Sequence, residues 1–161
     1  MTLPLTPSQT VGSYFAIGLG PTIGTHVVRE GTTGATRISG QVLDGAGQPV
    51  RDAVVETWQP EGVARSATDD EGLFAVVTVK PSRATSNAAP HIDVSVFARG
   101  LLTRLVTRVY FPDEGAANET DAVLQSLTPE DRTTLVASVD GGGLRFDIHL
   151  QGARETVFFD R

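Results

Sequence analysis

The sequence predicts an all-β fold, a β-sandwich of about seven to eight short strands with an extended N-terminal arm and one or two short helices. Two observations lead to this fold class. Short runs rich in Val, Ile, Thr and Phe recur from residue 37 to residue 159. Turns containing Gly, Pro or Asp separate these runs, and only residues 112–135 carry helix signals. Short strands of this kind bury their apolar faces by packing one sheet on another.

Each strand is expected from its local pattern. Residues 36–44 alternate apolar and polar side chains and end at the turn DGAGQP. Residues 73–81 are apolar on both faces, which predicts a central strand of a sheet. Residues 91–99 and 103–111 are joined by a short Gly-Leu-Leu link and predict a hairpin. The remaining strands are expected at residues 53–59, 135–140, 144–152 and 155–160. The GGG turn predicts a hairpin over residues 135–152, with Leu144, Phe146, Ile148 and Leu150 on one face.

Residues 112–135 predict two short helices or turns. Thr128 can cap a helix, Pro129 suits the first helical position, and Glu130 and Asp131 suit the first turn. The segment also holds acidic residues with no basic residue among them, and they lack the spacing of an EF-hand calcium loop. We expect a solvated loop for this acidic set, which comprises Asp113, Glu114, Glu119, Asp121, Glu130 and Asp131.

Length and composition favour one domain, residues 1–161, with no need for a covalent staple. The chain has no cysteine, which excludes disulfides, zinc–thiolate sites and thiol catalysis and is compatible with a cytoplasmic location. A net charge of −6 without a basic patch argues against a nucleic-acid partner. The longest apolar run, YFAIGLG, is too short to span a membrane, so no membrane association is expected.

The N-terminal arm, residues 1–36, has an unusual composition. Its first 25 residues contain no charged side chain, so the basic region of a secretory signal is missing. Pro4, Pro7, Pro21 and several glycines disfavour a regular helix there. An uncharged, non-helical arm is best accommodated against protein. The composition leaves open whether that protein is the chain's own domain or a partner chain.

Strand 91–99 holds the most suggestive pair of side chains. His91 and Asp93 are two residues apart, so both should project from one face of the strand. They supply only two ligands, and nothing brings His26 or His149 to them, so a metal site is not supported. A structural histidine bonded to backbone or to a neighbouring residue is the preferred interpretation. The other face of the strand should point into the core with Ile92, Val94, Val96 and Ala98.

Arg99 ends the same strand immediately before Gly100. A planar guanidinium at a loop-lined rim can bind a carboxylate through two parallel hydrogen bonds. A surface salt bridge of little energetic value explains the same residue equally well. The residues themselves do not decide between these two interpretations.

Five blocks, in chain order, carry a resemblance that spans nearly the whole chain: TPSQTVGSYFAIGL, GQVLDGAGQPVRDAVVETWQ, TDDEGLFAVVTVKP, APHIDVSVFARGLLTRLVTRVYFPDE and LRFDIHLQGARETVFFD. They resemble the intradiol ring-cleavage dioxygenase family, in its members that combine two homologous chains. The resemblance implies that the beta-type chain holds a non-haem Fe(III) through two tyrosines and a His-x-His pair.

In this chain His91 matches the first histidine of that pair, but Asp93 occupies the second position. No tyrosine follows Trp58 in the segment QPEGVARS, and none lies in loop 81–90. The resemblance therefore implies an alpha-type chain without a metal ligand or catalytic residue of its own. It would form alpha–beta units of a hetero-oligomer with the iron-bearing beta chain, and the arm would pack on that partner.

The implied reaction of the complex is O2-dependent intradiol cleavage of 3,4-dihydroxybenzoate to 3-carboxy-cis,cis-muconate in aromatic catabolism. Ser13 replaces a proline common in the arm of the family, and the stretch from Trp58 to Arg65 is short, so contacts made there are in question. The substrate-binding residues implied for this chain are Thr10, Gly12, Tyr14 and Arg99.

Two other hypotheses were weighed against this one. A transthyretin-like binding module without an enzyme explains the β pattern and the GAGQP turn, but it explains neither the uncharged arm nor the FARG segment. A self-sufficient intradiol enzyme fails because most of the iron ligands are missing.

Overall fold

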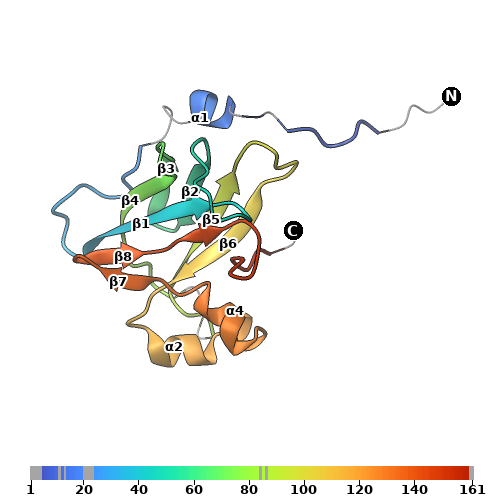
Figure 1. Cartoon of the computed structure of the whole chain (residues 1–161). Coiled ribbons are helices and arrows are strands. Elements are labelled where there is room, and N and C mark those ends of the chain that lie inside the picture. Colours follow the sequence, from blue (N-terminus) through green and yellow to red (C-terminus); the bar gives the residue numbers. More distant parts are fainter. Residues whose placement is uncertain are drawn as a thin grey trace.

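The computed structural model describes residues 5–10, 12, 14–19, 24–83, 85 and 87–159. In this part of the chain two β-sheets pack face to face, which confirms the predicted all-β sandwich (Figure 1). The first sheet has the order β4-β1-β8-β7, with β9 also paired to β1, and the second has the order β3-β2-β5-β6. The strands are β1 (Ala35–Leu43), β2 (Val54–Gln59), β3 (Gly62–Ala67), β4 (Leu73–Val79), β5 (His91–Phe97), β6 (Leu105–Tyr110), β7 (Ser138–Asp140), β8 (Gly143–Arg145) and β9 (Ile148–His149).

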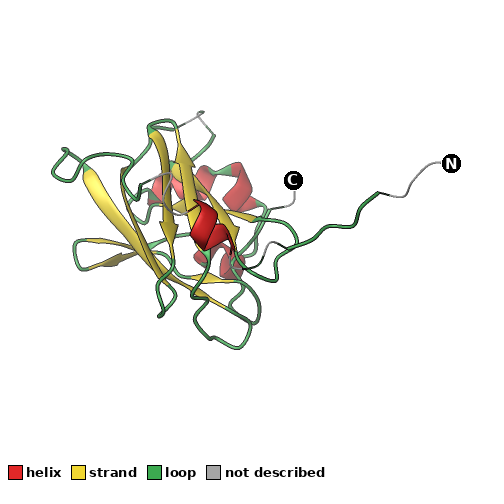
Figure 2. Cartoon of the chain, turned by 90° about the horizontal axis from the view of Figure 1, so that it is seen from above, coloured by secondary structure: helices red, strands yellow, loops and turns green. Residues whose placement is uncertain are grey.

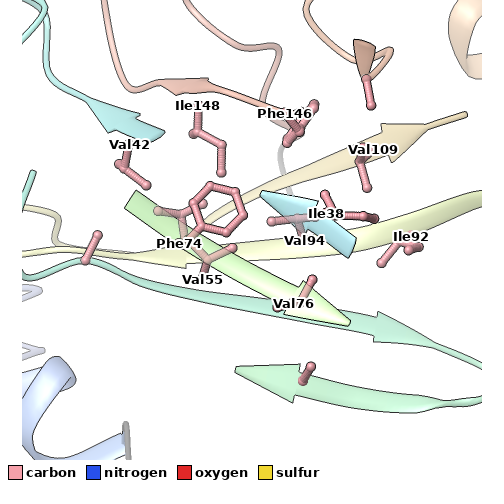
Figure 3. Close-up of a cluster of buried hydrophobic side chains, with 14 of the residues drawn as sticks. Ile38, Val42, Val55, Phe74, Val76, Ile92, Val94, Val109, Phe146 and Ile148 are labelled. Atoms are coloured by element: carbon pink, nitrogen blue, oxygen red, sulfur yellow. The ribbon is translucent and has the colours of Figure 1, made fainter. Parts of the chain in front are cut away.

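The main core lies between the two sheets, where side chains from both converge (Figure 3). The predicted inward face of β5 is confirmed, because alternate residues from Ile92 to Ala98 are buried in this core. Alternation along residues 144–150 is confirmed in the same way, with Phe146 and Ile148 fully inside. Core residues labelled in the figure are Ile38, Val42, Val55, Phe74, Val76, Ile92, Val94, Val109, Phe146 and Ile148.

The prediction that residues 73–81 form a central strand is wrong, because β4 lies at one end of its sheet. Its apolar outer face has another cause. Residues 25–27 of the arm run along β4, where the amide of Val27 donates to Val77 O and the amide of Val77 donates to Thr25 O, both at 2.8 Å. An edge strand covered in this way can be apolar on both faces.

Two other strand predictions had different outcomes. The hairpin of residues 135–152 is confirmed in part, since β7 and β8 are antiparallel, but β8 and β9 then pair in parallel with β1. Residues 155–159 form no strand. They still run along β6, with the Phe159 amide donating to Val106 O at 2.8 Å.

Four short helices are present in the described residues, more than expected: α1 (Tyr14–Leu19), α2 (Gly115–Thr120), α3 (Ala122–Gln125) and α4 (Pro129–Thr133). The capping prediction for α4 is confirmed, because the Thr128 hydroxyl accepts the Asp131 amide at 3.1 Å. The expectation of a non-helical arm is wrong at α1. This helix spans six residues between Pro7 and Pro21, so neither ring interrupts its hydrogen bonds. No helix in the described part of the chain is long and apolar enough to cross a membrane.

A second small core lies beneath α2, α3 and β6, and its polar centre is Asp121. The interpretation of the acidic set as a solvated loop is therefore wrong at this residue, which is 2% exposed. One carboxylate oxygen caps α3 through the amides of Val123 and Leu124, at 2.9 and 3.0 Å. The other oxygen accepts the Ala89 amide at 2.8 Å. A buried carboxylate is tolerated here because backbone donors replace the water it has lost.

Gly40 sits where β1 comes closest to the chain leading from β8. A Cβ atom there would lie 1.8 Å from Phe146 O and 2.8 Å from the Phe74 ring. We expect Gly40→Ala to lower the free energy of unfolding by about 2–3 kcal/mol, because the collision forces backbone apart in a packed core. Gly115→Ala is the matched control, since a Cβ there meets nothing within 4 Å. Denaturant unfolding of both variants checks this, and equal stabilities would contradict it.

Candidate functional site

The candidate site is the outward face of the second sheet together with the arm that crosses it. The register places Trp58 opposite Asp93, Glu56 opposite Ser95, and Val54 opposite Phe97. α1 lies against this sheet, with the Phe15 ring centroid 5.3 Å from that of Phe97 (Figure 2). The N-terminal segment before α1 extends away from the sandwich (Figure 1). The arm therefore contacts its own domain through α1 and again at residues 25–27, which pair with β4.

His91 and Asp93 do not form a joint site. The Nδ1 atom of His91 lies 2.8 Å from Ala89 O, and its ring packs beside the buried Tyr110. Asp93 instead accepts the Arg108 Nε group at 3.0 Å. The interpretation of His91 as a structural histidine bonded to backbone is confirmed.

The described residues do not fit the iron of an intradiol enzyme. They contain no group of three or more His, Asp or Glu side chains that could hold a metal ion. Tyr110 is fully buried and donates its hydroxyl to Asp121 at 3.2 Å, so this phenol is committed to the second core. Burial raises the pKa of Tyr110 to about 12, which disfavours the phenolate that a metal would need.

The other two histidines lie in separate places. His26 is on the segment beside β4 and pairs with Glu30 at 3.4 Å. His149 lines a pocket of about 360 Å³ beside α4, on the first sheet. Burial and the neighbouring Arg154 guanidinium hold the pKa of His149 below its usual range. No contact among the described residues brings either histidine to His91.

Three predicted substrate-binding residues lie together on the arm. The Gly12 amide donates to the Thr10 hydroxyl at 3.2 Å, and Gly12 has φ +64°, a conformation that favours glycine. Tyr14 begins α1 and is 63% exposed, with its ring against Gly18. Ser13 lies outside the described residues. The arm thus presents an exposed phenol and a tight turn away from its own sheet.

Arg99, the fourth predicted residue, does not end the strand as expected. β5 stops at Phe97, and Arg99 lies in the following turn, where Gly100 has φ +86°. Its Nε lies 3.2 Å from Asp52 Oδ2. The ion pair holds the side chain, yet 61% of that side chain remains exposed. The salt-bridge interpretation is thus correct as a contact, and it leaves the guanidinium accessible to a ligand.

No sequence pattern indicates Asp52 as the partner of Arg99. Its Oδ1 atom is buried and accepts no hydrogen bond from the described residues. A buried carboxylate oxygen of this kind has capacity for one more donor. Among the described residues no hydrogen bond or ion pair joins these arm residues to Arg99, and the arm contacts β5 through the Phe15–Phe97 ring pair.

Two pockets lie on this side of the second sheet, and Arg104 borders both. One, of about 430 Å³, is lined by Glu56, Trp58, Asp93, Ser95 and Arg104. The other, of about 160 Å³, lies between the arm and the turn after β5 and includes Phe15 and Phe97. Neither contains the four predicted residues.

Comparison with known proteins is informative over the full length. No family model matches the chain. The protocatechuate 3,4-dioxygenase alpha chain of Burkholderia cepacia is 41% identical over 203 aligned residues, covering 99% of this chain and 98% of that protein. The alpha chain of Pseudomonas putida is 40% identical and covers 98% and 97%. The beta chain from Burkholderia cepacia is 31% identical and covers 89% and 77%.

Solved structures agree on the fold. The dioxygenase domain of a carbohydrate-binding fusion protein from Streptomyces sp. SirexAA-E has a TM-score of 0.65 and 28% identity, covering 92% of this chain and 99% of that one. Hydroxyquinol 1,2-dioxygenase from Pseudomonas putida DLL-E4 has a TM-score of 0.59 at 18% identity, covering 79% and 59%, and supports the fold alone.

The sandwich and these likenesses define the class as an intradiol ring-cleavage dioxygenase, here without an iron-binding set in the described residues. More narrowly, the chain belongs to the protocatechuate 3,4-dioxygenase family, and the relatives with 40–41% identity are its alpha chains.

Proposed function

We propose that this chain is the alpha subunit of a protocatechuate 3,4-dioxygenase and acts as part of an alpha–beta hetero-oligomer. The complex would cleave 3,4-dihydroxybenzoate with O2 to 3-carboxy-cis,cis-muconate, with the non-haem Fe(III) on the beta subunit. One observation carries the assignment of roles. Where the resemblance places a His-x-His pair, this chain has His91 bonded to backbone and Asp93 bonded to Arg108. The proposal keeps the cytoplasmic location expected from the cysteine-free sequence.

The arm and Arg99 would contribute to the substrate pocket of the partner. Thr10, Gly12 and Tyr14 would line its wall, and Arg99 would approach the substrate carboxylate. Exposure supports this proposal. Tyr14 and Ile17 are 63% and 70% exposed on a helix that contacts its own sheet through Phe15, so an apolar face is left for a second chain.

The share of this chain in the reaction is positioning and charge complementarity. An arginine held in place by a carboxylate can bind an anionic substrate without being reorganised at the moment of reaction. A wall that fixes the ring lowers the entropic part of the barrier. No step of the bond chemistry is assigned to this chain, because its described residues offer neither metal ligands nor a nucleophile–base pair.

Expression with and without the beta chain tests the proposal. We expect the chain alone to bind no stoichiometric iron and to cleave no protocatechuate, since its strand lacks the ligands. Co-expressed with a beta chain, it should co-purify as a rust-coloured complex that consumes O2 and substrate. Iron analysis and oxygen uptake measure both. A coloured isolated chain with one iron per polypeptide would overturn the proposal.

A further inference from the structure

We infer that Arg65, neutralised by Glu56, is a positioning residue that fixes the arm over the second sheet and thereby sets the place of Tyr14 in the substrate pocket. The inference rests on the proposed function. Arg65 is not proposed to approach substrate itself, and the sequence gives little indication of its role. Glu56 and Arg65 are charged residues within strands that otherwise read as ordinary β segments.

The ion pair is buried on the face that α1 covers. Glu56 and Arg65 are directly opposite in the β2–β3 ladder, and their side chains are only 7% and 10% exposed. Arg65 donates through Nε to Glu56 Oε1 at 2.6 Å, and its Nη2 group contacts the same oxygen. The Trp58 indole donates to the second oxygen of Glu56 at 3.2 Å. Both carboxylate oxygens of Glu56 therefore accept hydrogen bonds, and these bonds fix the orientation of the Arg65 guanidinium.

The remaining donors of Arg65 reach the arm. Its Nη1 group donates to Leu19 O at 2.9 Å, and Leu19 is the last residue of α1. Its backbone amide donates to Gly24 O at 3.1 Å. One residue thus contacts the arm at both Leu19 and Gly24. A cation at a helix C-terminus also satisfies a carbonyl that has no partner inside the helix.

The position of α1 depends on tertiary contacts rather than on the stability of the helix itself. The helix has six residues, too few for an isolated helix to persist in water, and none of them is buried. At its other end α1 contacts the sheet through the Phe15–Phe97 ring pair. Two attachment points, one at each end of the helix, fix both its position and its rotation. Tyr14, at the N-terminal end, therefore depends on Arg65 at the C-terminal end.

The experiment compares variants of the alpha–beta complex by hydrogen exchange and by kinetics. Glu56→Gln combined with Arg65→Gln removes both buried charges together, so the sheet is not left with an unpaired ion. We expect backbone amides of residues 14–19 to exchange at least tenfold faster, and kcat/KM for protocatechuate to fall about tenfold, because misplaced pocket walls are costly. Arg65→Lys keeps the positive charge but lacks the planar guanidinium. We therefore expect it to change the exchange of residues 14–19 and kcat/KM less than the double variant does, but still measurably.

The matched control is Arg145→Gln combined with Asp147→Asn, which removes an ion pair of 2.6 Å from the first sheet. It should leave both the exchange of residues 14–19 and the kinetics unchanged. Unchanged exchange in the Glu56/Arg65 variant would overturn the inference, as would faster exchange without a change in kcat/KM. The wild-type complex is assayed first. If it does not cleave protocatechuate, the proposed function is refuted, whereas the inference about Arg65 is tested only by the variants.

Discussion

Asp121→Ala is expected to lower the free energy of unfolding by about 3–7 kcal/mol, from one lost helix cap of about 1 kcal/mol and two buried donors left unpaired at about 1–3 kcal/mol each. The two stranded donors are the Ala89 amide and the Tyr110 hydroxyl, which lie 2.8 and 3.2 Å from the carboxylate. Urea unfolding monitored by Trp58 fluorescence measures the change. Trp58 is the single tryptophan of the chain.

The contribution of Asp121 should also depend on pH. Burial raises the pKa of this carboxyl, but the amides of Leu124 and Ala89 and the Tyr110 hydroxyl outweigh it and hold the pKa below its ordinary value of 3.8. A depressed folded-state pKa stabilises the protein above the unfolded value and loses that effect as pH falls through the folded value. The stability of wild type should therefore fall more steeply than that of Asp121→Ala below about pH 4.

Thr128→Ala provides the control, because Thr128 caps α4 by the same kind of bond to Asp131 but is exposed. It should cost only about 1 kcal/mol. Equal losses in the two variants would mean that Asp121 acts as an ordinary cap, and the argument from its buried partners would fail.

Local sequence patterns are sufficient to predict the β-sandwich, but they do not predict which strands lie at the edges of its sheets. Period-two burial along β5 and along residues 144–150 is written in the residues themselves, and so is the Thr128 cap. The place of β4 depends on a distant segment at residues 24–27 that covers its edge. Apolar residues on both faces indicate only that a strand is covered, and nothing local says whether a strand or a loop covers it.

Some features of the candidate site can likewise be predicted from the sequence, and others cannot. The missing iron ligands are visible in the sequence, because Asp93 stands where a second histidine would be. The partners of charged side chains are not visible, since Arg99 with Asp52 and Arg65 with Glu56 pair across strands and turns. Asp121 was placed with solvated acids for the same reason. Composition gives the charge of a residue, and only the fold gives its neighbours.

Arg99→Ala in the alpha–beta complex is expected to raise KM for protocatechuate about ten- to a hundredfold, which corresponds to losing one charge-assisted bond of about 1.5–3 kcal/mol. Catechol lacks the carboxylate, so its KM should change much less. Steady-state oxygen uptake with both substrates measures the ratio. Arg51→Ala removes the same charge from an exposed neighbour of Asp52 and should change neither value. Equal increases for both substrates would argue for a structural arginine.

Asp52→Asn then separates the two possible roles of the ion pair. If Arg99 serves only the pair with Asp52, a pair with one partner 61% exposed is worth little, and both substrates should be unaffected by either variant. If Arg99 binds substrate, Asp52→Asn keeps the cation and loosens only its placement. It should then raise KM for protocatechuate less than Arg99→Ala does and leave catechol unchanged. If Asp52→Asn raised KM for protocatechuate more than Arg99→Ala did, the Asp52 carboxylate rather than the Arg99 guanidinium would be the more important group at this position.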